Sequence, residues 1–140
     1  MIIGCTGNYR KEEYFTILER IYSIFSKADV KLLVSDDLIK NDVFQIPSEY
    51  SLVEFDVLSK QADVLLAIGG DGTILSTVRR MGKNQKPIMG IHIGGLGFLS
   101  ECTESNLDTS IHYILNDEYG ISERMLLEAR IQSNGKKEIY

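Results

Sequence analysis

Short apolar runs recur along the chain, and each is bounded by polar or turn-forming residues. Four of these runs have the length and composition of β-strands, at residues 1–5, 30–35, 63–68 and 88–93. The third run contains Val-Leu-Leu-Ala-Ile, with no polar alternation. Such a run is typical of a strand that is covered on both faces, as in the centre of a parallel sheet.

Helical spacing of apolar residues fills most of the intervals between these runs. The clearest case is 11–27, where apolar side chains recur every three or four residues. The other predicted helices lie at residues 51–60, 73–81 and 107–115. The interval 39–50 has no such period and is predicted to be a surface loop. The alternation of strands and helices predicts an α/β fold with a doubly wound, mostly parallel sheet.

Polar residues and one glycine mark the ends of three helices. Ser51 with Glu54, and Ser105 with Asp108, have the spacing of a capping box. Gly82 directly follows the third helix, at a position where glycine commonly ends helices. These signals predict where the second and fourth helices begin and where the third one ends.

The last stretch of the chain has a different pattern. Residues 124–132 are predicted to form a strand, and the pair Asn134-Gly135 favours a tight hairpin turn into a returning strand. A hairpin alone is only marginally stable in water. We therefore expect residues 1–123 to form the α/β domain, and residues 124–140 to be the first strands of an incomplete, β-rich second domain.

Composition narrows the class of protein. The chain has 140 residues, of which 44% are hydrophobic, and a net charge of −5. This balance argues against nucleic acid or an anionic membrane as the main partner. The two cysteines, Cys5 and Cys102, are too few for a disulfide framework and suit a reducing compartment. With no apolar run near the ~20 residues of a membrane span, we expect a soluble cytoplasmic domain.

The most informative segment is 62–75, where a buried strand runs into the sequence Gly-Gly-Asp-Gly-Thr and a helix follows at once. Open α/β sheets bind ligands at the carboxyl ends of their strands. Glycines let a phosphate approach the backbone closely, and the helix start offers unpaired N–H groups. The segment therefore predicts a phosphate-binding turn made by Gly69, Gly70, Gly72 and Thr73 around Asp71.

Asp71 has two chemical uses in such a turn. It can accept a proton from an attacking hydroxyl, or it can hold a divalent cation that bridges phosphates. The structural alternative is that Asp71 and Thr73 only cap the helix while the glycines make a tight turn. Neither the G-x-G-x-x-G fingerprint nor the G-x-x-x-x-G-K-[ST] motif occurs in the chain.

A second glycine-rich segment, 90–101, follows the fourth strand. If that strand lies beside the third one, its glycines face the same sheet edge as Asp71. Phe98 and Leu99 then form either apolar walls for a planar base or part of the core. His92 can contact a ligand or be packed inside the fold, and both interpretations stay open. With His112 and the two cysteines it shows no metal-ligand spacing.

These two motifs resemble those of the NAD kinase family. The match consists of GGDGT, then a helix and a strand, then G-x-x-x-G-x-L-G-F-L, and it extends to the sequence ERMLLE at 123–128. GGDGT alone also occurs in diacylglycerol kinases, sphingoid kinases and relatives of phosphofructokinase, whereas the second motif is particular to NAD kinases. The resemblance implies a kinase that phosphorylates the 2′-hydroxyl of the adenosine ribose of NAD to give NADP.

The resemblance also assigns roles to residues. Asp71 matches the general base, Gly72 a glycine that contacts NAD, and Phe98 an aromatic residue near the dinucleotide; Thr73 completes the phosphate-facing turn. Many members have a basic residue three positions after the threonine, where this chain has Ser76. Arg79 and Arg80 are conceivable substitutes, although cations near a helix C-terminus usually lie on a solvated face.

The resemblance further implies ATP or polyphosphate as phosphate donor, a divalent cation such as Mg²⁺, and a homo-oligomer, dimer or tetramer. The family's Asn-Glu motif and β-rich second domain are expected beyond Tyr140, so the 140 residues alone are predicted to be inactive. Two alternatives stay open. One is a lipid or sphingoid kinase that shares the GGDGT loop, and the other is a non-catalytic nucleotide-binding domain.

Overall fold

The protein, analysed as a computed structural model, is described over residues 1–40, 47–94, 97–127, 129–133 and 136–139. Its centre is a five-stranded parallel sheet with the strand order β3-β2-β1-β4-β5. The strands are β1 (Ile2–Gly7), β2 (Lys31–Ser35), β3 (Ser51–Val53), β4 (Val64–Gly69) and β5 (Ile88–His92). This order confirms the predicted doubly wound α/β fold.

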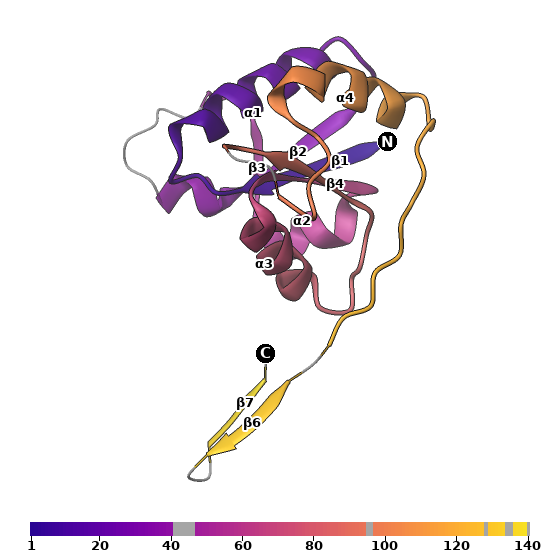
Figure 1. Ribbon diagram of the computed structural model, residues 1–140. Helices are drawn as coiled ribbons and strands as arrows, with labels where there is room; N and C mark the ends of the chain where they lie inside the picture. Colours follow the sequence, from indigo (N-terminus) through magenta and orange to yellow (C-terminus); the bar gives the residue numbers. More distant parts are fainter. Residues whose placement is uncertain (41–46, 95–96, 128, 134–135, 140) are drawn as a thin grey trace.

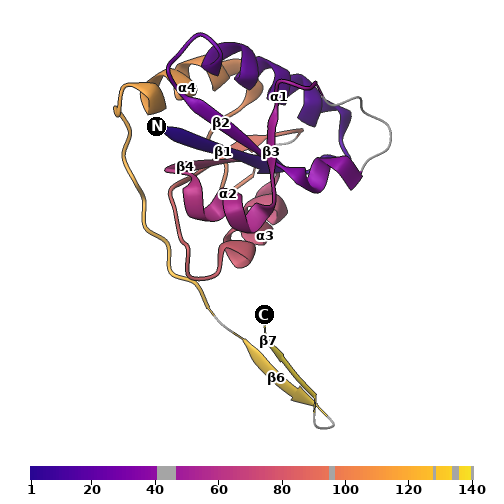
Figure 2. The same ribbon diagram turned by 180° about the vertical axis from the view of Figure 1, so that it is seen from behind.

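Helices cover both faces of the sheet (Figure 1). On one face lie α1 (Glu12–Phe25) and α4 (Leu107–Leu115), and on the other lie α2 (Phe55–Gln61) and α3 (Asp71–Met81). The same three layers are visible from behind (Figure 2). Two short 3₁₀ turns, η1 (Asp36–Lys40) and η2 (Glu104–Asn106), complete the elements of the α/β body.

The core forms on both sides of β4, whose six residues are all buried. Val64, Leu66 and Ile68 pack into the cluster that includes the buried residues of α1 and α4, while Leu65 packs with Leu33 and Leu58 on the opposite face. Period-two alternation of side chains along a strand produces this division. It explains why the run Val-Leu-Leu-Ala-Ile has no polar positions.

Truncating Leu66 to alanine is expected to lower the free energy of unfolding by about 2–5 kcal/mol, because the side chain is fully buried and the cavity left behind cannot collapse completely. Chemical denaturation followed by circular dichroism measures this change. Leu75→Ala is the matched control, since Leu75 is 55% exposed and surface substitutions usually shift stability by less than about 0.5 kcal/mol. Equal losses in the two variants would contradict this account of the core.

The four predicted strands and four predicted helices are confirmed, with ends that shift by a few residues, but both capping boxes are wrong. Ser51 lies in the short edge strand β3, and α2 begins only at Phe55. Before α4, the box is formed by Thr103 and Asn106 instead. Gly82 does end α3, with a φ of 54°.

An antiparallel hairpin, β6 (Arg130–Ser133) and β7 (Lys136–Ile139), follows the α/β body. Figures 1 and 2 both show it standing apart from the sheet at the end of an extended segment. The predicted strand at 124–132 is thus shorter than expected, and the predicted turn at 134–135 lies outside the described residues. So does 41–46, half of the predicted surface loop.

The strand order creates a switch point between β1 and β4, which are neighbours in the sheet. From β1 the chain continues through α1 to β2 on one side, and from β4 it continues through α3 to β5 on the other. A crevice opens outside the carboxyl ends of the strands where the order reverses in this way. The GGDGT turn follows β4 directly at this edge.

Candidate functional site

The GGDGT turn joins β4 to α3 with no intervening loop. Gly69 is the last residue of β4, Gly70 is the N-cap, and Asp71 is the first residue of α3. A Cβ on Gly69 would lie 2.7 Å from the Cβ of Thr73, so only glycine allows this close return of the helix. At Gly70, by contrast, an added Cβ would meet nothing within 4 Å.

Asp71 is held by two backbone amides of the second glycine-rich segment. The N–H of Phe98 donates to Oδ2 at 2.9 Å, and the N–H of Leu99 donates to Oδ1 at 3.0 Å. These bonds, first that from Phe98 and then that from Leu99, lower the pKa of the Asp71 carboxyl below its ordinary value, and the nearby charge of His92 lowers it further. The side chain stays partly exposed.

Gly97 is required by the same carboxylate. A Cβ on Gly97 would lie 2.9 Å from Cγ of Asp71 and closer still to Oδ1. The φ of Gly97 is outside the left-handed region, so contact with Asp71, and not backbone strain, is what requires a glycine here. The two glycine-rich motifs are therefore joined through one side chain.

Phe98 and Leu99 contribute their backbone amides to the site, and their side chains are not part of the core. The ring of Phe98 is 100% exposed and the side chain of Leu99 is 40% exposed. The interpretation of this pair as core residues is therefore wrong. The predicted neighbourhood of both residues to Asp71 is confirmed, because β5 pairs with β4 in parallel and the segment after β5 returns to the start of α3.

His92 is the last residue of β5 and pairs with Gly69 in the register of the sheet. Its side chain is 8% exposed. Nδ1 lies 3.0 Å from Oγ of Ser100. Nε2 is buried and has no hydrogen-bond partner among the described residues.

The other polar residues of α3 lie away from the turn. Arg79 and Arg80 are in the last turn of the helix, as the solvated-face interpretation predicts. Arg80 pairs with Asp37, at 2.6 Å, and its guanidinium carbon lies 3.8 Å from the ring centroid of Phe55. Arg80 therefore packs at the end of α3 that lies opposite Asp71. Ser76 is exposed in the middle of the same helix.

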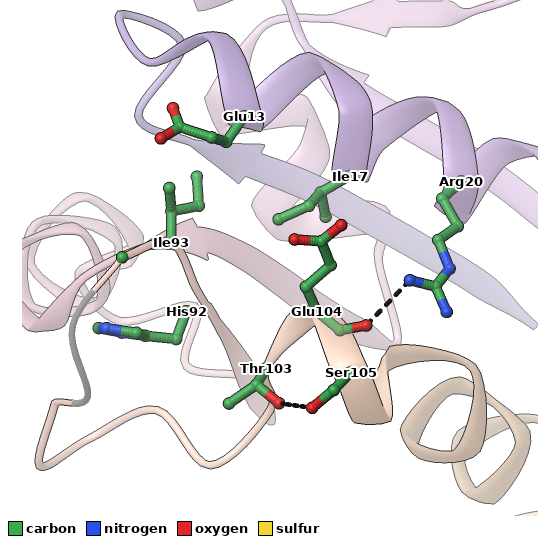
Figure 3. A pocket seen from close by; sticks show the side chains of 9 residues that line it. Glu13, Ile17, Arg20, His92, Ile93, Thr103, Glu104 and Ser105 are labelled. Atoms are coloured by element: carbon green, nitrogen blue, oxygen red, sulfur yellow. Dashed lines mark hydrogen bonds between the residues drawn. The ribbon is translucent and has the colours of Figure 1, made fainter.

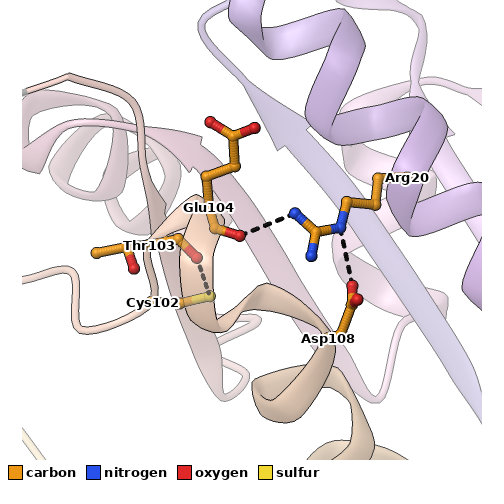
Figure 4. Close-up of polar contacts among 5 residues, drawn as sticks. All are labelled: Arg20, Cys102, Thr103, Glu104 and Asp108. Carbon is orange, nitrogen blue, oxygen red and sulfur yellow. Dashed lines mark hydrogen bonds and ion pairs between the residues drawn. The ribbon is translucent and has the colours of Figure 1, made fainter.

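A pocket of about 500 Å³ lies beside this site, between α1 and the segment that leads into α4 (Figure 3). Its lining includes Glu13, Ile17 and Arg20 of α1, together with His92 and Glu104, but not Asp71. Arg20 is already engaged there, because its Nε lies 2.9 Å from Oδ1 of Asp108 and a terminal nitrogen donates to the carbonyl of Glu104 (Figure 4). No motif or spacing in the sequence indicated this pocket.

The residues that the structure describes form no metal centre, and neither cysteine is exposed. Cys5 and Cys102 are both buried and unpaired, and burial raises the pKa of the Cys5 thiol to about 12. Within the described ranges, no three side chains of His, Cys, Asp or Glu gather in a way that could hold a metal ion. None of the helices described is long and apolar enough to span a bilayer.

Comparison with known proteins identifies relatives over nearly the whole chain. The profile of the ATP-NAD kinase N-terminal domain family matches residues 3–119. An NAD kinase of Sulfurimonas denitrificans is 36% identical over 119 residues, which cover 85% of this chain and 40% of the relative. An NAD kinase of Natranaerobius thermophilus is 30% identical over 135 residues, which cover 96% of this chain and 46% of the relative.

A solved structure agrees on the fold. The crystal structure of yeast NADH kinase complexed with NADH superimposes with a TM-score of 0.80 at 19% identity, covering 99% of this chain and 45% of that one. The 140 residues therefore span less than half the length of the relatives that they match. Because the family profile covers most of the sequence, including both glycine-rich motifs, the chain belongs to the ATP-NAD kinase family and corresponds to its N-terminal domain.

Proposed function

We propose that the protein containing this chain phosphorylates the 2′-hydroxyl of the adenosine ribose of NAD to give NADP, with Asp71 as the general base. The observation that carries this proposal is the ionised, partly exposed carboxylate that two amides fix at the opening of α3. It occupies the carboxyl end of a central strand in a chain of the ATP-NAD kinase family.

The turn around Asp71 supports binding of phosphates. Added side chains at Gly70 and Gly72 would meet nothing within 4 Å, so the fold itself does not require glycine there. Their absence leaves the backbone open to a close ligand, and the N-terminus of α3 attracts negative charge. We assign Gly69, Gly70, Gly72 and Thr73 to the phosphates, and the exposed ring of Phe98 to stacking on a base.

In the proposed reaction, the 2′-oxygen attacks the terminal phosphorus of ATP or polyphosphate. A P–O bond forms to the ribose, the P–O bond to the next phosphate breaks, and the hydroxyl proton passes to Asp71. The backbone amides of the turn stabilise the charge that develops on the transferred group.

In this proposal, Mg²⁺ enters only as an ion bound to the phosphates of the donor. The described residues offer no cluster of three metal-ligating side chains. They do not fit a protein-held metal centre. Mg²⁺ commonly binds the phosphates of a nucleotide with few protein ligands, and no step above passes through it.

The remaining expectations extend the same proposal. We assign residues 1–123 to the α/β domain and 124–140 to the first strands of a β-rich second domain, which the separate hairpin β6–β7 supports. Met125 and Leu127 are more than nine-tenths exposed, as suits surface that further protein covers. Assembly as a dimer or tetramer and a cytoplasmic location complete the proposal, the latter supported by two unpaired cysteines.

The test is an assay for NADP with the protein in its full natural length. The purified protein is incubated with NAD and either Mg·ATP or polyphosphate, and NADP is detected with an NADP-specific dehydrogenase. We expect NADP with at least one donor, and no phosphorylation of diacylglycerol or sphingosine. Nucleotide binding without any NADP would instead favour a non-catalytic domain.

A further inference from the structure

His92 is a buried titratable group that the proposed reaction does not yet use. One ring nitrogen, Nδ1, is anchored to Ser100, and the other, Nε2, has no partner among the described residues. A buried polar atom without a hydrogen bond costs about 1–3 kcal/mol. Such an atom next to a reaction site calls for a functional explanation.

The position of His92 relates it to Asp71 in two ways. In the sheet it pairs with Gly69, two residues before Asp71. Through the second glycine-rich segment, Leu99 donates its amide to Asp71 while the next residue, Ser100, contacts the imidazole. The charge of the imidazole also acts on the carboxyl, since it contributes to the lowered pKa of Asp71.

Asp71 by itself binds only weakly the proton that it must remove from the hydroxyl. Two amide hydrogen bonds stabilise its ionised form. In general, a neutral imidazole binds a proton more strongly than a carboxylate does. A proton taken by Asp71 therefore has a thermodynamic reason to move on to a neighbouring base.

We propose that His92 is the second member of a proton relay: Asp71 accepts the proton of the 2′-hydroxyl and passes it, directly or through one water, to Nε2 of His92. The imidazole becomes an imidazolium and Asp71 returns to its carboxylate form. After product release the proton passes back to Asp71, which is partly exposed, and from there to solvent. The inference rests on the proposed function. His92 acts through Asp71 and has no need to touch the substrate, and Ser100 fixes the orientation of its ring.

Several charged groups lie in the neighbourhood of His92. Asp71 of α3 acts on it, Glu13 and Arg20 of α1 and Glu104 of η2 line the same pocket, and Nζ of Lys11, the α1 N-cap, lies near Gly94. Carboxylates favour the imidazolium, whereas Arg20 and Lys11 oppose it. The relay works only when Nε2 of His92 is free to accept a proton, so it is lost under acidic conditions that protonate the imidazole.

The kinetic test compares the full-length protein with its His92→Asn variant between about pH 5.5 and 8.5. Asparagine retains a polar atom near the position of Nδ1, which preserves the bond to Ser100, but it cannot titrate. We expect the variant to be at least about tenfold slower at the alkaline end, and the two rates to converge at the acid end, where His92 is protonated. Because both proteins see the same donor, titration of ATP cancels in the ratio.

The outcomes separate the relay from the proposed function. A rate ratio that is constant across the pH range, or equal to one throughout, overturns the relay but leaves Asp71 as the base. A parent protein that forms no NADP overturns both. His112→Asn is the matched control, because His112 is exposed on α4, outside the site, and its removal is expected to leave the pH profile unchanged.

A spectroscopic measurement tests the coupling without catalysis. The 140-residue chain contains two histidines, so the ring nitrogens of both can be followed by ¹⁵N NMR during a pH titration. Asp71→Asn removes a negative charge and is expected to shift the ¹⁵N resonances of the His92 ring while leaving those of His112 unchanged. An unchanged His92 would show that the two groups do not interact and would overturn the relay.

Discussion

Asp71→Asn is expected to lower the rate of NAD phosphorylation by about 10²- to 10⁴-fold, the range typical for loss of a general base. The amide is nearly isosteric with the carboxylate but cannot accept the hydroxyl proton. It can also satisfy only one of the two amides of Phe98 and Leu99 with its oxygen, because its nitrogen is a donor. NADP formation under saturating NAD and donor measures the loss in kcat.

Asp29→Asn is the matched control for this substitution. Asp29 is exposed in the turn before β2, and the same chemical change there is expected to leave the rate unaltered. The backbone ¹⁵N shifts of Phe98 and Leu99 report how far the loosened contact disturbs the second glycine-rich segment. A variant that forms NADP near the parent rate would show that Asp71 is not the base.

The fold was predictable because its signals are local. The run in β4 has no polar position, since both its faces are buried, and the apolar stripe of α1 has the period of a helix. Ser51–Val53 was missed because a three-residue edge strand gives no period, while the Ser-x-x-Glu spacing imitates a helix start. Tertiary pairing with β2 decides that segment.

For the candidate site, the sequence indicated which segments take part but not which contacts join them. GGDGT and the second glycine-rich segment stand out in the sequence, but nothing in it indicates that Asp71 binds two amides 27 and 28 residues away. Almost every residue has a backbone amide, so residue types do not indicate which amides will donate to a given carboxylate. His92 was likewise left between two interpretations, because burial and an unpartnered nitrogen are properties of the folded chain.

Gly97→Ala is expected to reduce NAD phosphorylation by about 10²-fold without removing any functional group. The new Cβ would occupy the space of the Asp71 carboxylate, which must rotate away from the amides of Phe98 and Leu99. Displacement of a reacting group by about 1 Å can cost this much in rate. The backbone at Gly97 has no left-handed φ that would forbid alanine, so the fold is expected to remain intact.

Two measurements distinguish this displacement from general damage. The pKa of the Asp71 carboxyl, followed by ¹³C NMR, is expected to rise toward the ordinary value of about 3.9, because the amides no longer stabilise its charge. Gly120→Ala, where an added Cβ meets nothing within 4 Å, is the matched control and should change neither pKa nor rate.

A double variant makes the dependence on Asp71 explicit. If Gly97 serves the reaction only by leaving room for the carboxylate, then adding Gly97→Ala to Asp71→Asn has little left to remove, and the double variant should be about as slow as Asp71→Asn alone. Losses that simply multiply would mean that Gly97 acts on the reaction independently of Asp71. The two glycine-rich motifs would then be coupled through a contact other than that between Gly97 and Asp71.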